Sequence, residues 1–204
     1  MSHAEPDDRR SLPADLETLP ELYALLASCL SRPDRELLEA IETGDLEAEL
    51  SRLTAPLSLE VGSPPSFADE DDAREAYRRT FDAYDGPSAP PVESVHEPWH
   101  DGTNRELLSG PAAVDMRRRY AELGVDTPGD YQPDHVALLL EYASLVLEAG
   151  EFGCYDQFHE EHFDWIPAFR ARIEETDGDP FYRWAVATLE SALEAVDEYR
   201  RSDR

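Results

Sequence analysis

The chain of 204 residues suits one domain and carries 46 acidic side chains against 18 basic ones, all of them arginine, for a formal net charge of −28. Because 41% of the residues are hydrophobic and recur at helical spacing, a disordered acidic chain is excluded. The small number of basic residues also excludes the broad basic face that nucleic-acid binding would need.

The first part of the chain contains an arginine pair but no export signal. Residues 1–12 are polar and are predicted to be a flexible N-terminus. Arg9 and Arg10 look like a twin-arginine signal, but Pro13 and Asp15 follow them in place of an apolar core, so we reject a signal peptide. No stretch reaches the roughly 18 apolar residues that cross a bilayer. We therefore expect a cytoplasmic protein.

The remainder of the chain is predicted to be all-α. Apolar residues recur at steps of three and four, and no stretch alternates with the period of two that is typical of a strand. Helices are predicted from about residue 14 to near Pro33, over 35–43 up to Gly44, over 46–53, within 69–84, and over 111–123, 133–149, 151–175 (broken near Pro167) and 180–200. A long loop at about 83–110 is rich in proline and glycine. We predict one all-helical domain over 13–204, packed as a bundle around the 133–149 helix.

That central segment carries polar residues at its head. Pro133 suits the first helical position, Asp134 suits the positive end of the helix dipole, and His135 is expected in the first turn. Apolar residues cover every face of the rest of the helix. Glu141 is then expected to need a hydrogen-bond donor, because an unpaired buried carboxylate costs several kcal/mol.

Few residues offer catalytic chemistry. Histidines lie in two clusters, His96 and His100 in "HEPWHD" and His159 and His162 in "CYDQFHEEHFDW". Their spacing matches neither the H-E-x-x-H nor the H-x-x-E-H pattern of zinc enzymes. Phosphate-binding loops, nucleophile elbows and dinucleotide fingerprints are also missing from the sequence. We predict no catalytic residue, no metal and no cofactor.

Composition also indicates the environment in which the protein works. A strongly acidic chain without lysine resembles the proteins of salt-accumulating haloarchaea, in which the acidic shell serves solvation. Most carboxylates are therefore expected to have no specific role. Cys29 and Cys154 are far apart and form no C-x-x-C motif, which favours a reduced cytoplasmic compartment.

Five motifs follow one another along the chain: "YRRTF" (77–81), "PPVESVH" (90–96), "PDHVALLLEY" (133–142), "FHEEHFDWIPAF" (158–169) and "PFYRWAVATLESAL" (180–193). In this order and spacing they resemble the TorD/DmsD-type chaperones that mature molybdenum-containing oxidoreductases. The resemblance extends from about Leu16 to Tyr199. The chain departs from the family pattern at Thr80, where leucine is usual, at His96, where an aromatic residue is usual, and at Tyr131, where an acid often stands.

The resemblance implies a chaperone and not an enzyme. Such a protein binds the twin-arginine signal peptide and the apo form of a client molybdopterin oxidoreductase of the dimethyl sulfoxide or trimethylamine oxide reductase type, and delays export until the cofactor is inserted. The peptide-binding residues that it implies here are Tyr77, Phe81, Pro91, Glu93, Ser94, His96, Asp134 and His135. Leu138 and Glu141 would add an apolar wall and a further carboxylate if the fold brings them there.

Two other functions remain open. The first is a helical adaptor or regulator that binds a partner helix without preference for signal peptides. The second is a small metal-dependent helical enzyme that uses the histidines at 96, 100, 159 and 162. Stoichiometric zinc or iron in the purified protein would favour the enzyme, and partners other than a molybdoenzyme would favour the adaptor.

Overall fold

The computed structural model describes residues 16–82, 87–96, 110–125, 131–176 and 178–202, and within these ranges the chain is all-α, as predicted. The helices are α1 (Leu19–Leu30), α2 (Arg35–Thr43), α3 (Asp45–Thr54), α4 (Glu70–Phe81), α5 (Pro111–Leu123), α6 (Val136–Glu148), α7 (Phe152–His162), α8 (Ile166–Glu175) and α9 (Pro180–Ser202). A short 3-10 helix, η2 (Glu93–Val95), lies in the segment predicted as a loop. The predicted flexible residues 1–12 and most of the predicted 83–110 loop lie outside the described ranges.

Several helix ends lie where the sequence placed its start and stop signals. The Asp34 carboxylate accepts a hydrogen bond from the Leu37 N–H at 2.9 Å and begins α2. Gly44 adopts a left-handed conformation with φ 82°, which ends α2 and lets α3 begin at the next residue. Gly124 ends α5 in the same way, with φ 69°. Local signals therefore define these boundaries.

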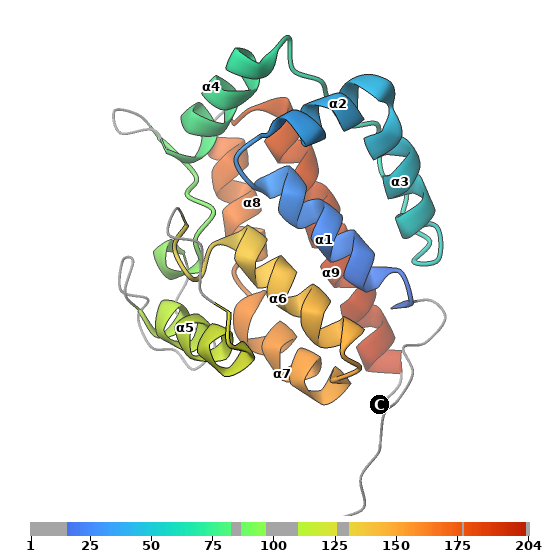
Figure 1. Cartoon of the computed structure of the whole chain (residues 1–204), viewed down its shortest axis with the longest axis vertical. Coiled ribbons are helices and arrows are strands. Elements are labelled where there is room, and N and C mark those ends of the chain that lie inside the picture. Colours follow the sequence, from blue (N-terminus) through green and yellow to red (C-terminus); the bar gives the residue numbers. More distant parts are fainter. Residues whose placement is uncertain (1–15, 83–86, 97–109, 126–130, 177, 203–204) are drawn as a thin grey trace, which may run out of the picture.

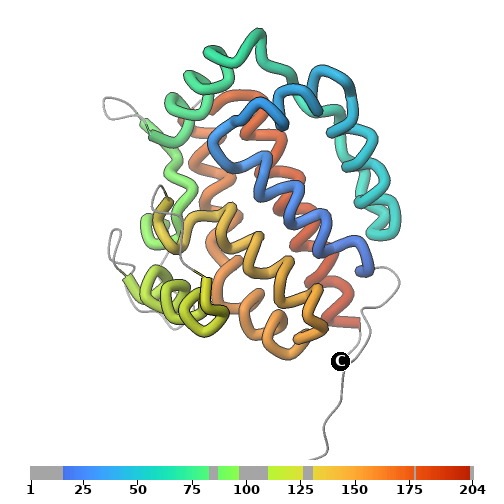
Figure 2. The backbone as a smooth tube through the Cα atoms, viewed as in Figure 1, coloured from blue at the N-terminus to red at the C-terminus, as the bar shows by residue number. Residues whose placement is uncertain are grey.

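The helices α1 and α6 form the centre of the bundle. They lie side by side in front of α9 (Figure 1), and α1 also contacts α3 and α9 while α6 contacts α7. The smooth trace shows α2 and α3 flanking α1 on one side, with α5 and α7 near α6 (Figure 2). One hydrophobic cluster joins these helices, including buried Tyr23 of α1, Leu139 of α6 and Val186 of α9. Each such side chain contributes about 1.5–3 kcal/mol when fully buried, so this cluster determines the packing.

The central helix α6 begins three residues later than the sequence predicted. Pro133 and Asp134 lie in the preceding turn, and His135 is the N-cap, with φ −69° and ψ 137°. The Glu93 N–H donates to the Asp134 carbonyl at 3.0 Å, and the Val136 N–H donates to the Pro91 carbonyl at 2.8 Å. These bonds to the 87–96 segment hold His135 in an extended conformation, so the helix begins only after it.

One stripe of α6 reaches the surface. Glu141, Leu145 and Glu148 are exposed, and Leu145 retains 47% of its accessible surface. The prediction that apolar packing covers every face was therefore wrong for this stripe. Glu141 lies on this exposed stripe, so its carboxylate meets water and needs no buried donor.

The predicted helix over 151–175 consists of α7 and α8, and the break comes before Pro167 and not at it. Residues 163–165 form the turn, in which the Trp165 indole N–H donates to the His162 carbonyl at 2.8 Å. Pro167 lies in the first turn of α8, where its missing N–H needs no partner.

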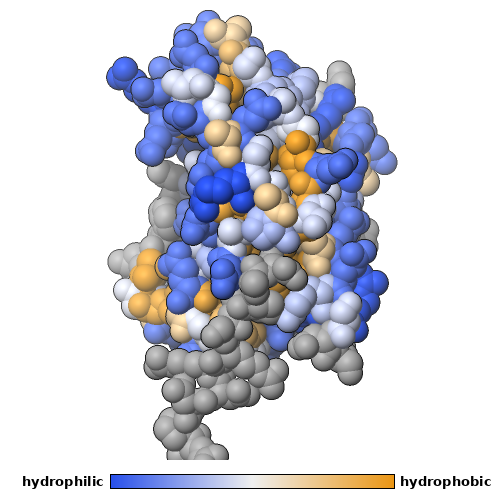
Figure 3. Space-filling view, turned by 90° about the vertical axis from the view of Figure 1, so that its right-hand side faces the viewer, coloured by the Kyte–Doolittle hydropathy of each residue, from blue (hydrophilic) through white to orange (hydrophobic). Residues whose placement is uncertain are grey.

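Hydrophilic side chains cover most of the face seen in Figure 3, and apolar side chains appear there in small separate patches. None of the described helices combines the length and the apolar composition needed to span a membrane.

Candidate functional site

The residues that the sequence assigned to peptide binding are mostly turned inward. Eight of them are buried: Tyr77, Phe81, Pro91, Glu93, Ser94, Asp134, His135 and Leu138. His96 is half-buried, and Glu141 is exposed. Apart from Glu141 and Leu138, they meet at an internal junction, which we call the loop–helix junction: the segment 87–96, the end of α4 and the head of α6.

Asp134 ties the loop to the helix in this junction. Its carboxylate accepts a hydrogen bond from the Ser94 N–H at 2.8 Å, and the neighbouring residues Val92 and His135 form an antiparallel bridge. The second carboxylate oxygen of Asp134 and the Ser94 hydroxyl are buried and have no hydrogen-bond partner among the residues that the structure describes. Because a buried carboxylate needs its donors, removal of the Asp134 side chain is expected to loosen the loop.

His135 is a neutral histidine held in an aromatic environment. Its Nδ1 accepts a hydrogen bond from the Ala137 N–H at 3.2 Å, so Nε2 carries the proton and faces the Tyr77 hydroxyl at 3.4 Å. The Tyr131 ring packs against the imidazole with a centroid distance of 4.4 Å. Burial, with a further contribution from the nearby Arg32 charge, lowers the pKa of His135 to about 3.

The three departures from the family pattern each have a structural partner. The Thr80 hydroxyl accepts a hydrogen bond from the Asp179 N–H at 3.0 Å, just before α9. His96 stacks on Trp165 with ring centroids 4.8 Å apart, and so takes the place of an aromatic side chain. The Tyr131 hydroxyl accepts a hydrogen bond from the Arg32 N–H at 2.9 Å. These residues therefore hold elements together at and around the loop–helix junction.

Sequence reasoning missed a second feature, a chain of charged side chains that we call the buried charge network. Glu93 and His162 are fully buried and lie 2.8 Å apart, from the Glu93 carboxylate to the His162 Nδ1. The other imidazole nitrogen faces the Asp115 carboxylate at 3.1 Å. Arg119 binds Asp115 and also Glu161, the latter at 2.6 Å. The network thus joins η2, α5 and α7.

The pKa values of the network follow from these contacts. Burial alone would lower the pKa of His162, but its hydrogen bonds to Asp115 and Glu93 raise it above the usual value. Burial would likewise raise the pKa of Asp115, yet hydrogen bonds from His162, Arg118 and Arg119 hold it well below its usual range. The arrangement therefore favours a charged imidazole between two carboxylates.

One part of this network has the ligand types of a cation site. Asp115, Glu161 and His162 each offer one atom, and these atoms lie within 4.8 Å of one another. The Arg119 guanidinium already binds both carboxylates, and its centre lies 5.3 Å from the Phe158 ring centroid. Arg119 thus supplies the positive charge that these acids need.

The histidines of the metal-enzyme alternative do not converge. His159 faces Asp197 at 3.0 Å and His162 faces Glu93, while His96 stacks on Trp165. His100 lies outside the described ranges. Among the residues that the structure describes, His162 is the one histidine in a group with the ligand types of a metal site.

The chain resembles known proteins both in its fold and in its sequence. The crystal structure of a "Putative Redox Enzyme Maturation Protein" from Archaeoglobus fulgidus has the same fold, with a TM-score of 0.51 and 20% identity over 91% of this chain and 94% of that one. A family model, described as the nitrate reductase delta subunit, matches residues 21–177. The chain therefore belongs to this family of TorD-like chaperones. A search of curated proteins found no match.

Loss of the Asp115 charge should destabilise the fold. In Asp115→Asn the buried charge network loses the carboxylate shared by Arg119 and His162, and we expect a loss of about 3 kcal/mol in the free energy of unfolding. This is the low end for a broken buried ion pair, because the Asp115 side chain retains 15% exposure. Denaturant unfolding followed by circular dichroism measures the change.

The matched control is Asp71→Asn, the same substitution at a side chain that is 94% exposed. It should change the free energy of unfolding by no more than about 0.5 kcal/mol. Equal stability of Asp115→Asn and the control would show that the network contributes nothing net.

The depressed pKa of His135 predicts a specific pH dependence. Above about pH 6.5 the imidazole is neutral in both folded and unfolded chains. As the pH falls from there toward about 3, His135 becomes protonated in the unfolded chain but stays neutral in the folded chain. The free energy of unfolding therefore decreases. The loss should approach about 1.4 kcal/mol per pH unit relative to His135→Asn, which keeps an N-cap but cannot titrate. Parallel stability curves for the two proteins would contradict this.

Proposed function

We propose that this chain is a cytoplasmic chaperone that binds the twin-arginine signal peptide and the apo form of a molybdopterin oxidoreductase, and delays its export until the cofactor is inserted. The observation that carries the proposal is the match of the nitrate reductase delta subunit family over residues 21–177. The ordered TorD/DmsD-type motifs and the shared fold of a redox enzyme maturation protein support it. The client that we propose is a reductase of the dimethyl sulfoxide or trimethylamine oxide type.

The chemistry of such a peptide sets what its receptor must offer. Two guanidinium groups need carboxylates placed for short, charge-assisted hydrogen bonds, and the apolar stretch that follows needs an apolar surface beside them. The chain carries 46 acidic residues, so carboxylates are abundant. A binding site is distinguished from the acidic shell by apolar side chains that lie between its acids.

The buried residues Asp134 and His135 enter the proposal as positioning residues. The hydrogen bond from the Ser94 N–H to Asp134 and the antiparallel bridge between Val92 and His135 hold the 87–96 segment against the head of α6. In this role they fix the shape of the loop, and they do not need to touch the client themselves.

Binding of a signal peptide is the direct test of the proposal. Isothermal titration with the twin-arginine leader of a dimethyl sulfoxide or trimethylamine oxide reductase should show saturable binding. The matched control is the same leader with both arginines changed to glutamine, which should bind more weakly because glutamine offers no charge-assisted fork. Absence of heat with any twin-arginine leader would refute the proposal, as would stoichiometric zinc or iron with a metal-dependent activity.

Affinity for the leader should hold or rise between about 0.5 and 3 M salt. At about 1 M the Debye length is about 3 Å, so long-range attraction by the −28 net charge is screened. Short-range ion pairs and apolar burial remain, and salting-out ions strengthen apolar burial. In this range, removal of two leucines from the leader should weaken binding more than one arginine-to-glutamine change.

The measurement is a salt titration of leader binding in which circular dichroism confirms the fold at each point. A steady fall in affinity while the fold persists would show that long-range electrostatics dominates, contrary to this expectation.

A further inference from the structure

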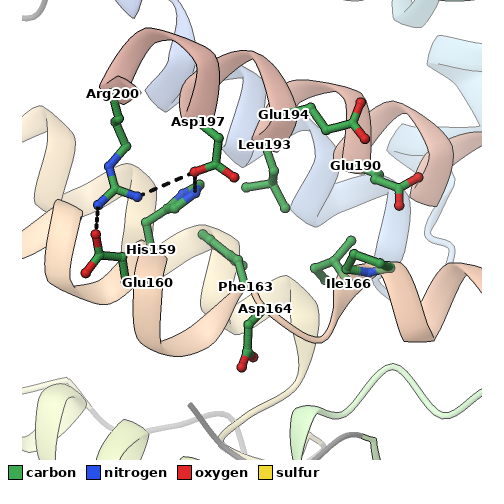
Figure 4. Close-up of a pocket in the computed structure, with 11 residues that line it drawn as sticks. His159, Glu160, Phe163, Asp164, Ile166, Glu190, Leu193, Glu194, Asp197 and Arg200 are labelled. Atoms are coloured by element: carbon green, nitrogen blue, oxygen red, sulfur yellow. Dashed lines mark hydrogen bonds and ion pairs between the residues drawn. The ribbon is translucent and has the colours of Figure 1, made fainter. Parts of the chain in front are cut away.

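A groove lies on the outside of the bundle, and none of its lining residues belongs to the loop–helix junction. It runs between α9 and the corner where α7 meets α8, and it encloses about 310 Å³. Figure 4 shows Asp197, Leu193, Glu194 and Glu190 along α9 on one side. Ligand pockets span about 300–1,000 Å³, so this groove suits side chains of a peptide and not a large ligand.

The floor of the groove is apolar. Phe163, Ile166 and Leu193 line it, and all three belong to the core, because Ile166 is fully buried while Phe163 and Leu193 keep 5% and 6% of their surface exposed. Pro167 completes the apolar lining at the start of α8 and is exposed. An aliphatic side chain laid here would be removed from water on several sides, and its burial is favourable.

The rim of the groove is acidic. Five carboxylates line it against one guanidinium, that of Arg200: Glu160, Asp164, Glu190, Glu194 and Asp197. On α9 the acids stand at 190, 194 and 197, a spacing that puts them on one face of the helix, where like charges repel. Of the described side chains that line the groove, Arg200 alone carries a fixed positive charge, so a cationic partner would be complementary to it.

The chain itself shows how an arginine fits this rim. Arg200 reaches across from α9 to Glu160 of α7 at 2.7 Å, and it also lies 3.6 Å from Asp197 (Figure 4). Asp197 in turn contacts His159 at 3.0 Å. One end of the groove is therefore already closed by a guanidinium between two carboxylates.

One acid in the middle of the groove has no partner among the described residues. Glu190 is bound by Arg170, and Asp197 is bound by His159 and Arg200. For the exposed Glu194 carboxylate between them, no hydrogen bond or ion pair occurs within the described ranges. Glu194 and Leu193 both line the groove, so a free carboxylate stands beside the apolar floor.

We propose that this groove docks an arginine-bearing apolar segment of the client, with a guanidinium paired to Glu194 and an aliphatic side chain over Phe163, Pro167 and Leu193. The inference rests on the proposed function and names where the leader binds. Acidic surface alone would not distinguish the groove in a chain of this composition. The apolar floor does so, because solvating acids need no buried surface between them.

The test compares two charge reversals on mid-helix, exposed glutamates. Glu194→Arg places a guanidinium where the leader's arginine would bind, and Glu39→Arg makes the same charge change on α2. The probe is a synthetic peptide of two adjacent arginines followed by a leucine-rich stretch, titrated at high salt. Glu194→Arg should bind it at least about tenfold more weakly than the wild type does. Glu39→Arg should stay within about twofold of the wild type, because salt screens its distant charge.

A second measurement locates the peptide directly. A photo-crosslinking residue placed beside the arginine pair should attach to the segments 159–167 and 190–200, identified by mass spectrometry. Wild-type binding that persists unchanged in Glu194→Arg, or crosslinks confined to other surfaces, would overturn this inference alone. Failure of the wild type to bind the peptide or any twin-arginine leader would overturn the proposed function and this inference together. A dimer that Glu194→Arg dissociates would assign the groove to a second copy of the chain and also overturn it.

Discussion

The short antiparallel pairing between the 87–96 segment and the head of α6 is the constraint on which the site depends. Two backbone hydrogen bonds, from Glu93 to Asp134 and from Val136 to Pro91, hold the 87–96 segment against the residues that begin α6. They delay the start of α6, bury Asp134, and bring the Glu93 side chain to His162 of α7. The pairing thus forms the loop–helix junction and supplies the Glu93 carboxylate of the buried charge network.

The buried polar groups are largely satisfied within the protein, and this limits what they can do for a partner. Glu93 and His162 bond to each other, and Asp115 and Glu161 share Arg119. Breaking such contacts to bind a peptide would leave charges buried and unpaired, which is costly. If a client binds as proposed, binding costs less free energy on a surface such as the groove along α9. There Glu194 is exposed and the apolar floor is already formed.

The buried junction and network on the one hand, and the groove on the other, therefore have different roles in a chaperone of this family. The junction and the network join η2, α5, α6 and α7 through buried hydrogen bonds and ion pairs. The groove lies on α9 and the α7–α8 corner, and Phe163 and Ile166 link it to the same hydrophobic cluster. A peptide bound there would contact a preformed surface, which reduces the entropy lost on binding.

The sequence by itself determined the helical class and many helix ends, because these depend on local chemistry: the Asp34 cap, the left-handed Gly44 and the apolar spacing of α1 act over a few residues. It also identified the family, which the family model matching residues 21–177 confirms. Tertiary structure decided which residues face water. Periodicity gave α6 its apolar faces but not the helices that cover them, so Glu141 was wrongly expected inside and Asp134 was expected at a rim. Asp115 and His162 form their contact from two different helices. Because only the packing of α5 against α7 brings them together, no local sequence pattern predicts it.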